Sequence, residues 1–420
     1  MDRSSLSVLD SLALRMSGGR AAVVVVADAT GALAALPVVE RGSGWAVAAP
    51  GDGVTLAALD LLAGDGAPPA AETPGFRAML YDRIPVSEPR ERSLGTDQSN
   101  TSVVLGEDII VKWRTSFAAS GARAATLRRH LAAHAFDGVP ALLGILSWRG
   151  PTGEVVLADI DARLPAAVDG WDRFIDVLSA DAESAMLPKR GQAAGLCVQL
   201  GRLCARLHVA LARPSSVIPA PRGAADAHEI GDWHQAAYAA LAQAADIEAD
   251  DQAVVTARRS ALAGDIDRLT RVRRSPLQPT HGDLHLGQVV AAAHGLAIID
   301  FDGPPRSADS QALVFEPAAR DVAQLSCSLQ LLAVVVDRRT DHRFARELRA
   351  WSSMAQTLFM RAYRQTLAKG GGTGLFDERL LTPFVAEQLC RELIYAADFL
   401  PRWRYAAIGA LQSSYPEVER

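Results

Sequence analysis

The order of apolar and polar residues predicts strands in the first part of the chain. AAVVVVAD (21–28) and LPVVE (36–40) are short apolar runs joined through the turn sequence ATG, and GWAVAAPGDG (44–53) continues the pattern. A stretch rich in glycine, alanine and proline follows at 63–75. We interpret residues 1–90 as an N-terminal α/β cap subdomain, in which no catalytic group of residues is apparent.

Residues 91–165 are predicted to form a β-rich N-lobe. TSVVLGEDIIVKW (101–113) contains two apolar runs around the turn sequence GED, which predicts a pair of strands. A helical stretch follows at 121–136, and the apolar runs at 141–148 and 154–160 predict further strands.

Helical periodicity dominates the rest of the chain and predicts a mostly helical C-lobe over 166–420. Four leucines within 196–207 recur at spacings of 4, 3 and 4 residues, which places them on one helical stripe. The glycine-rich sequence KGGGTG (369–374) predicts the end of a helix. Longer helices are predicted over 235–273, 318–337, 341–369 and 383–397.

Composition narrows the choice of function. Hydrophobic residues make up 49% of the chain and the formal net charge is −5, so no overall basic field favours nucleic acid or an anionic membrane. The longest apolar run, 21–27, is far shorter than the roughly 20 residues that span a bilayer, and the first residues lack the features of a signal peptide. Four cysteines without a CxxC pair predict free thiols. We expect a soluble cytoplasmic protein and predict no oligomeric state.

Candidate chemistry is concentrated in HGDLHLGQVVAAAHGLAIIDFDG (281–303). GQVV and LAII are short β-like runs around AAHG, so we predict a hairpin that brings Gln288 and Asp300 to one end. A carboxylate and an amide oxygen are hard ligands that suit Mg²⁺. Asp283 lies one loop earlier, where it can accept a hydroxyl proton.

This order of a base, an amide and a strand-end aspartate is the layout of a kinase. His281-Gly282-Asp283 resembles the catalytic loop of the aminoglycoside phosphotransferase-like small-molecule kinases. The resemblance implies an α+β, bilobal protein-kinase-like fold with the N-lobe, C-lobe and cap described above. It also implies ATP and Mg²⁺ as cofactors.

A kinase also needs a phosphate-binding loop and a strand lysine, and the N-lobe sequence supplies both. Lys112 follows an apolar run, so its ammonium can reach the α and β phosphates. However, residues 113–136 contain no Glu or Asp, so the helix glutamate that pairs with this lysine in protein kinases is missing. The predicted phosphate-loop residues are Gly95, Gln98, Ser99, Asn100 and Thr101.

Several strings together resemble the actinobacterial maltokinase-like group. The resemblance covers about 90–410, and in that group a glutamine in place of asparagine at Gln288 is typical. Arg320 and Asp321, in ARDVA, are interpreted as bracing the catalytic loop. The strings are DQSNTS, DGW (169–171), LGRLCARLH, HGDLHLGQV, IDFDGPP and ARDVA.

QLCRELIYAADFLPRW (388–403) resembles a signature of the actinobacterial glucosamine kinases, a branch of the same group. The resemblance implies phosphorylation of glucosamine, with Glu392 and Asp302 pairing with the ammonium at C2. His285 either contacts the sugar or caps the loop. The other predicted substrate residues are Gln388, Arg391, Tyr395 and Trp403. The alternatives are a maltokinase, an aminoglycoside phosphotransferase and a nucleotide-binding pseudokinase.

Overall fold

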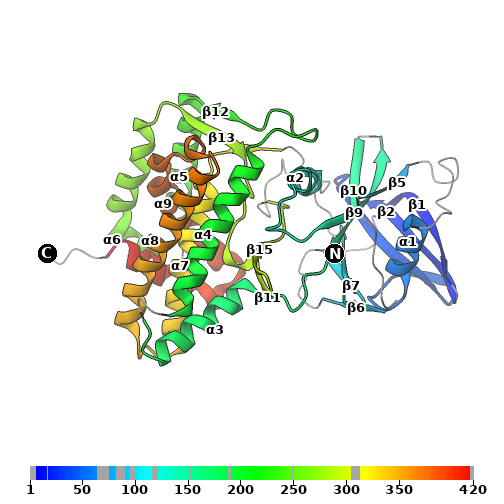
Figure 1. The fold of residues 1–420 in the computed structure, drawn as a ribbon, viewed down its shortest axis with the longest axis horizontal. Coiled ribbons are helices and arrows are strands. Elements are labelled where there is room, and N and C mark those ends of the chain that lie inside the picture. The colour runs from blue at the N-terminus through cyan, green and yellow to red at the C-terminus, as the bar shows by residue number, and fades with distance from the viewer. Residues whose placement is uncertain are drawn as a thin grey trace. The chain divides into compact units, whose positions relative to one another are not determined.

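The computed structural model describes residues 6–16, 18–63, 75–81, 90–94, 100–115, 122–151, 153–187, 191–247, 249–303 and 313–416. The chain divides into two compact units (Figure 1). The first comprises Met1–Ala166 and Asp300–Leu313, and the second comprises Ala167–Ile299 and Val314–Arg420. The segment that contains Asp300 and Asp302 therefore belongs to the unit that contains Lys112.

The N-terminal part of the first unit is an antiparallel sheet with the strand order β1-β2-β3-β4. The strands are β1 (Ser7–Met16), β2 (Gly19–Ala27), β3 (Leu33–Arg41) and β4 (Gly44–Val47), and the helix α1 (Val54–Ala63) follows them. The strands predicted from 21–28 and 36–40 are confirmed. β1 was not predicted, although its second half alternates exposed and buried residues as a half-buried strand should.

A six-stranded sheet with the order β5-β9-β10-β8-β7-β6 completes the first unit. The predicted strands 101–113, 141–148 and 154–160 are confirmed, as is the helix at 121–136. β5 lies within the range predicted as the cap but pairs with β9. The elements are β5 (Phe76–Leu80), β6 (Glu91–Ser93), β7 (Thr101–Leu105), β8 (Ile109–Trp113), α2 (Ala122–Ala133), β9 (Leu142–Gly150) and β10 (Gly153–Ala162).

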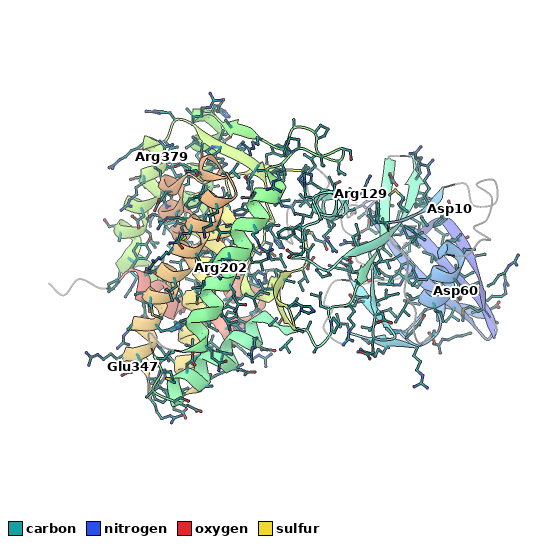
Figure 2. All side chains as sticks on the ribbon, viewed as in Figure 1. Asp10, Asp60, Arg129, Arg202, Glu347 and Arg379 are labelled. Atoms are coloured by element: carbon teal, nitrogen blue, oxygen red, sulfur yellow. The ribbon has the colours of Figure 1, made fainter. Side chains whose placement is uncertain are left out.

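The two sheets of the first unit share one hydrophobic core, which includes residues of β1, β2, α1, β7, β8 and β10. Trp113 Nε1 donates to Thr55 Oγ1 at 3.1 Å. Trp148 Nε1 donates to a carboxylate oxygen of Asp10 at 2.7 Å. Asp10 is labelled in Figure 2. The predicted boundary at residue 90 thus falls inside a continuous core.

The second unit is mostly helical, as predicted for 166–420. The predicted helix 235–273 is instead two helices followed by a 3₁₀ turn at Asp267–Arg271. α5 begins at a capping box formed by Asp226 and Glu229. The helices are α3 (Gly170–Glu183), α4 (Gln192–Leu211), α5 (Ala227–Ala244), α6 (Ala249–Ile266), α7 (Ala319–Arg339), α8 (Ala345–Lys369), α9 (Leu381–Phe399) and α10 (Arg404–Ser414).

Close helix packing forms the core of this unit. A Cβ on Gly201 of α4 would lie 2.3 Å from the carbonyl oxygen of Phe359 in α8, so only glycine allows this approach. α7 is long and apolar enough to cross a membrane by length and composition, but 78% of its most apolar window is buried inside the protein. Such burial is what a core helix requires.

Short strands frame the catalytic loop. β13 (Ser275–Pro279) precedes it, and β14 (Val289–Ala292) and β15 (Gly295–Ile298) follow as the predicted hairpin. β11 (Val168–Asp169) pairs with β14, while β12 (Gly223–Ala225) and β16 (Phe315–Glu316) pair with β13.

Candidate active site

The loop His281–Gly282–Asp283 is fixed by the buried carboxylate of Asp321, near the start of α7. Its Oδ1 accepts from the Gly282 N–H and its Oδ2 from the His281 N–H, both at 2.9 Å. Although complete burial opposes ionisation, hydrogen bonding from His208 lowers the pKa of Asp321 below its ordinary value. Asp321 therefore braces the loop as a carboxylate, as predicted.

Two further side chains of α7 fix the rest of the loop. Gln324 Oε1 accepts from the Leu284 N–H at 2.8 Å, and Ser328 Oγ accepts from the Leu286 N–H at 3.3 Å. One face of α7 thus satisfies the backbone of the catalytic loop, because a loop that adopts neither helix nor sheet needs other partners for its N–H groups.

A second layer supports Asp321. His208 of α4 places Nε2 3.1 Å from Asp321 Oδ2 and Nδ1 2.8 Å from the hydroxyl of Tyr363 in α8. Because a carboxylate only accepts, Nε2 donates to it, while Nδ1 shares a hydrogen bond with the tyrosine hydroxyl. Neither His208 nor Tyr363 has an exposed side chain.

Arg320 was predicted to brace the catalytic loop together with Asp321, but its ion pairs lie elsewhere. Arg320 forms ion pairs with Glu316 at 3.2 Å and with Glu387 at 3.1 Å. Its guanidinium also lies 4.2 Å from the centre of the Phe384 ring. It joins α7 to α9 rather than to the loop backbone.

His285 caps the short 3₁₀ helix Leu286–Gln288. Its Nδ1 accepts from the Gly287 N–H at 3.1 Å, so the neutral ring has its proton on Nε2. Nε2 lies 3.8 Å from Asp283 Oδ2. The capping role predicted for His285 is therefore present in the structure, and its contact to the sugar stays a prediction.

Glu392 of α9 belongs to the same group of side chains. Burial raises the pKa of its carboxyl group, and the charge of Asp283 adds to this effect, while a hydrogen bond from Gln388 opposes it. The Gln388 Nε2 donates to Glu392 Oε1 at 2.8 Å. Four predicted residues therefore interact: Asp283, His285, Gln388 and Glu392.

Arg391 is engaged elsewhere. Its Nη2 and Nε lie 2.6 and 2.9 Å from Oε1 of Glu387, which is 1% exposed. This pair extends the ion-pair network of Arg320 and stabilises α9. The contact to substrate predicted for Arg391 stays a prediction.

Aromatic side chains flank the end of α9. Trp403, predicted as a sugar contact, forms an edge-to-face pair with Trp171 of α3 at 6.0 Å between ring centres. Tyr395 is 44% exposed and lies 5.1 Å from Phe399. Trp171 was not among the predicted site residues, although the DGW string that contains it pointed to this position.

In the first unit, Lys112 of β8 is held by two carboxylates of the IDFDG segment. Its Nζ lies 2.9 Å from Asp300 Oδ1 and 3.0 Å from Asp302 Oδ2. Burial works against the charge of Lys112, but Asp302 and Asp300 raise its pKa above the ordinary value. Lys112 is therefore a paired cation and not a solvated edge lysine.

Arg114 extends this cluster. It forms ion pairs with both Asp302 and Asp159. Burial opposes the charge of Asp302, but the neighbouring Arg114 and Lys112 hold its pKa well below the ordinary value. Asp302 is thus ionised, and its pairing with a substrate ammonium stays a prediction.

α2 has a basic character where protein kinases have a glutamate. Arg123 Nη1 donates to the carbonyl oxygen of Phe301 at 2.7 Å, and Arg128 pairs with Asp161 at 2.6 Å. The helix therefore holds the backbone between Asp300 and Asp302 through an arginine. Sequence reasoning missed Arg114 and Arg123, because neither lies in a recognisable spacing to its partners.

Asp300 directly follows the last residue of the β14–β15 hairpin that is hydrogen-bonded across it. The Ile299 N–H donates to the Gln288 carbonyl at 2.9 Å, which ends the β14–β15 ladder. Asp300 comes next, with a φ of 60°, a left-handed conformation that aspartate tolerates better than most residues. A non-glycine residue in this conformation is frequently part of a functional site.

The described part of the predicted phosphate loop begins at Asn100. Thr101 opens β7, and its Oγ1 lies 3.1 Å from Thr115 Oγ1. Gly95, Gln98 and Ser99 lie outside the described residues.

Known proteins with similar sequences and structures place the chain in a family. The model of a phosphotransferase enzyme family matches residues 90–355. A glucosamine kinase of Streptacidiphilus jiangxiensis is 34% identical over 403 residues, which cover 94% of this chain and 89% of that protein. A glucosamine kinase of Mycolicibacterium smegmatis is 31% identical over 408 residues, with coverages of 96% and 98%.

A solved structure agrees with these relatives. A glucosamine kinase in complex with glucosamine, ADP and inorganic phosphate aligns with a TM-score of 0.80 and 31% identity, over 98% of this chain and 94% of that one. The similarity includes the N-terminal sheet as well as both predicted lobes. The protein-kinase-like fold expected from the HGD and DFDG motifs is thereby confirmed, and the chain belongs to the phosphotransferase enzyme family, in the part of it that contains these glucosamine kinases.

Proposed function

We propose that this chain is an ATP- and Mg²⁺-dependent kinase that converts glucosamine to glucosamine 6-phosphate. Two relatives named glucosamine kinases support the substrate, as does the solved kinase with bound glucosamine and ADP. The observation on this chain that supports it most is the half-buried carboxyl group of Glu392, whose pKa is raised by desolvation and by the charge of Asp283. A partly desolvated carboxylate is costly beside a neutral sugar, whereas a substrate ammonium would compensate it.

Asp283 is the proposed catalytic base. Its carboxylate accepts the proton of the 6-hydroxyl as the new bond from the sugar oxygen to phosphorus forms and the bond from phosphorus to the ADP oxygen breaks. The braced loop fixes the backbone of Asp283 before substrate binds, which is a form of preorganisation. Lys112 and the loop at 95–101 are proposed to hold the phosphates.

Mg²⁺ is proposed to bind Gln288 and Asp300, whose oxygens are suitable hard ligands. Asp302 Oδ1 is buried and has no hydrogen-bond partner in the described part of the chain, so a further oxygen is available near Asp300. The described residues contain no group of three or more His, Cys, Asp or Glu side chains that could hold a metal. Mg²⁺ usually takes one or two carboxylates and completes its shell with phosphates and water. Bound Mg²⁺ neutralises charge on the transferred group.

The proposed partners are small molecules, a sugar and a nucleotide, and the proposed location is the cytoplasm. The four cysteines are buried and free, and burial raises the pKa of Cys197 to about 12. Such thiols are inert and fit a reducing compartment.

A substrate panel tests this function. Purified protein with ATP and Mg²⁺ is expected to phosphorylate glucosamine, with the phosphate located at C6 by NMR, and to leave glucose and maltose nearly unchanged. Asp283→Asn is expected to lower kcat by about 10²–10⁴-fold, the range of general-base catalysis. Turnover of maltose without glucosamine would identify a maltokinase, and turnover of an aminoglycoside alone would identify that class. Absence of ATP consumption with every acceptor would favour a pseudokinase.

A further inference from the structure

The helical unit contains a pocket that is separate from the catalytic loop. Its volume is about 790 Å³, and it is lined by residues of α7 and α8, the start of α9 and the end of α10. Pockets that bind small ligands in proteins have volumes of about 300–1,000 Å³. The pocket is therefore large enough for a mono- or disaccharide.

α7 separates this pocket from the catalytic loop. Asp321, Gln324 and Ser328 hold the loop, whereas Gln330 and Asp337 line the pocket. At 3.6 residues per turn, the two sets of residues point to opposite faces of α7. The pocket is thus not part of the active site.

α8 presents a polar stripe to the pocket. Arg349, Ser352, Ser353 and Gln356 recur at helical spacing and all line it. Arg349 and Ser353 are exposed and Gln356 is half-buried, whereas Ser352 is 8% exposed and its side chain has no hydrogen-bond partner within the described residues. On the facing helix, Asp337 Oδ1 is buried and equally without a partner in that part of the chain. Buried polar groups are normally satisfied, so Ser352 and Asp337 fit a polar ligand in this pocket.

The charges of the pocket restrict what that ligand can be. Asp265 accepts from the Tyr415 hydroxyl at 2.8 Å and pairs with Arg268 at 3.0 Å. Asp337 pairs with His342 at 2.7 Å. Arg349, which has no ion-pair partner within the described residues, supplies a positive charge in the same lining against the charge of Asp337. The lining as a whole therefore favours neither a cation nor a phosphate.

The remaining lining supplies both donors and acceptors beside apolar surface. Hydroxyl and amide groups suit the hydroxyls of a sugar, while Ala333, Leu348 and Met360 suit its C–H faces. We propose that this pocket is a second binding site, for a neutral polyhydroxylated molecule of the sugar class.

Binding of glucose, maltose and myo-inositol by calorimetry tests the proposal on the full chain. Ser353→Trp fills the pocket from an exposed position of α8, and Ala350→Trp adds the same group on α8 at an exposed position outside the pocket. We expect at least one of the three compounds to bind wild type and Ala350→Trp equally and Ser353→Trp at least about tenfold more weakly. Glucosamine phosphorylation is expected to be unchanged in both variants, which keeps this test separate from the proposed function.

A second pair of variants keeps the test valid if Ser353→Trp fails to fold. Gln356→Leu removes a lining amide, and Gln365→Leu makes the same change at an exposed position of α8 outside the pocket. Weaker binding only in Gln356→Leu would support the site. Equal affinity in all four variants, or no binding of any of the three compounds to wild type, would overturn the proposal.

Discussion

The ammonium of Lys112 is held by carboxylates that follow it by 188 and 190 residues. This pairing explains why residues 113–136 need no acid. Asp300 and Asp302 supply the negative charge that a helix glutamate supplies in protein kinases. We infer that the cluster keeps Lys112 charged and in place until the phosphates of the nucleotide take over as its partners.

Replacing Asp300 with Asn tests its role as a metal ligand. The change keeps the shape but removes one charge from a side chain that is 35% exposed, so we expect the fold to be unaffected and kcat to fall by at least about 10²–10³-fold, as for loss of other electrostatic contacts to the transition state. Kinase activity and thermal unfolding measure the two effects. Asp60→Asn, at an exposed position on α1 (Figure 2), is the control. Wild-type turnover by Asp300→Asn would contradict the assignment.

Glu392 predicts a pH dependence. Because its pKa is raised, its carboxylate protonates above the ordinary Glu value of about 4.3 as the pH falls. If the ionised form pairs with the substrate ammonium, KM for glucosamine rises as the pH falls through this raised pKa. Glu392→Gln is expected to have a high KM that no longer changes in this range. Glu347→Gln, at an exposed position on α8 (Figure 2), should keep the wild-type profile.

Glu392→Gln is expected to weaken substrate binding without lowering the stability of the fold. A carboxyl group whose pKa is raised on folding stabilises the folded state below its unfolded pKa, and this contribution is lost as the pH rises through the folded pKa. Near neutral pH, Glu392→Gln is therefore expected to be at least as stable as wild type in thermal unfolding. A large loss of stability together with the raised KM would point to a structural role instead.

Single residues differed in how far the sequence predicted them. Asp283, Gln288 and Asp300 lie in one short stretch with a characteristic spacing, so their roles could be proposed from the sequence. Arg114 and Arg123 could not be, because their partners lie on a distant segment and an arginine on a strand or helix is usually solvated. Their importance depends on burial, which only the folded structure shows.

At the scale of secondary structure, α2 holds the segment that follows β15, which is proposed to bind the metal. Arg123 is 6% exposed and holds the Phe301 carbonyl. Its Nη1 also lies 3.1 Å from the place where a Cβ on Gly303 would be, and the φ of 83° at this position favours glycine as well. α2 thus substitutes a contact to the backbone for the missing ion pair.

Arg123→Met tests this substitution. Loss of a buried charged hydrogen bond costs about 1.5–3 kcal/mol, so we expect kcat to fall by about 10–100-fold. The diagnostic readout is the Mg²⁺ dependence, which is expected to shift to higher Mg²⁺ because Asp300 loses its support. Arg129→Met, on the same helix (Figure 2), is the control. An unchanged Mg²⁺ dependence would assign Arg123 to stability alone.

The helices were predicted where their pattern was regular. α7 and α8 begin and end within a few residues of 318–337 and 341–369, because each has a long apolar face and the glycine-rich stretch ends α8. The prediction of one helix over 235–273 was wrong, since α5 and α6 each have apolar residues at helical spacing and the sequence between them contains no glycine or proline to mark a break.

At the scale of the whole molecule, the N-terminal sheet belongs to the same unit as the six-stranded sheet that contains Lys112. Glu91 of β6 accepts from the N–H groups of Gly51, Gly53 and Leu56 at 2.8–3.0 Å and so caps the start of α1. The sequence predicted a boundary at residue 90, beyond the glycine-, alanine- and proline-rich stretch at 63–75. The core on either side of it is nevertheless shared, which composition alone does not reveal.

Removing residues 1–63 is therefore expected to unfold the first unit and not merely to delete a cap. The truncation would expose the side of the six-stranded sheet where Leu105, Trp113 and Leu157 are at most 1% exposed. Each Å² of apolar surface that returns to water lowers the free energy of unfolding by about 25 cal/mol. We expect an insoluble or unfolded product without kinase activity.

A milder change makes the same point without truncation. Val25 is fully buried in β2 and belongs to the shared core, so Val25→Ala is expected to lower the free energy of unfolding by about 1–3 kcal/mol. If the N-terminal sheet and the strands β7 and β8 unfold as one unit, the variant loses ATP binding and N-terminal structure at the same denaturant concentration, and that concentration is lower than in wild type. Val8→Ala, at a position 66% exposed in β1, is the control. Retention of ATP binding after the N-terminal sheet has melted would show instead that the sheet is an independent cap, because a shared core cannot be lost from one side only.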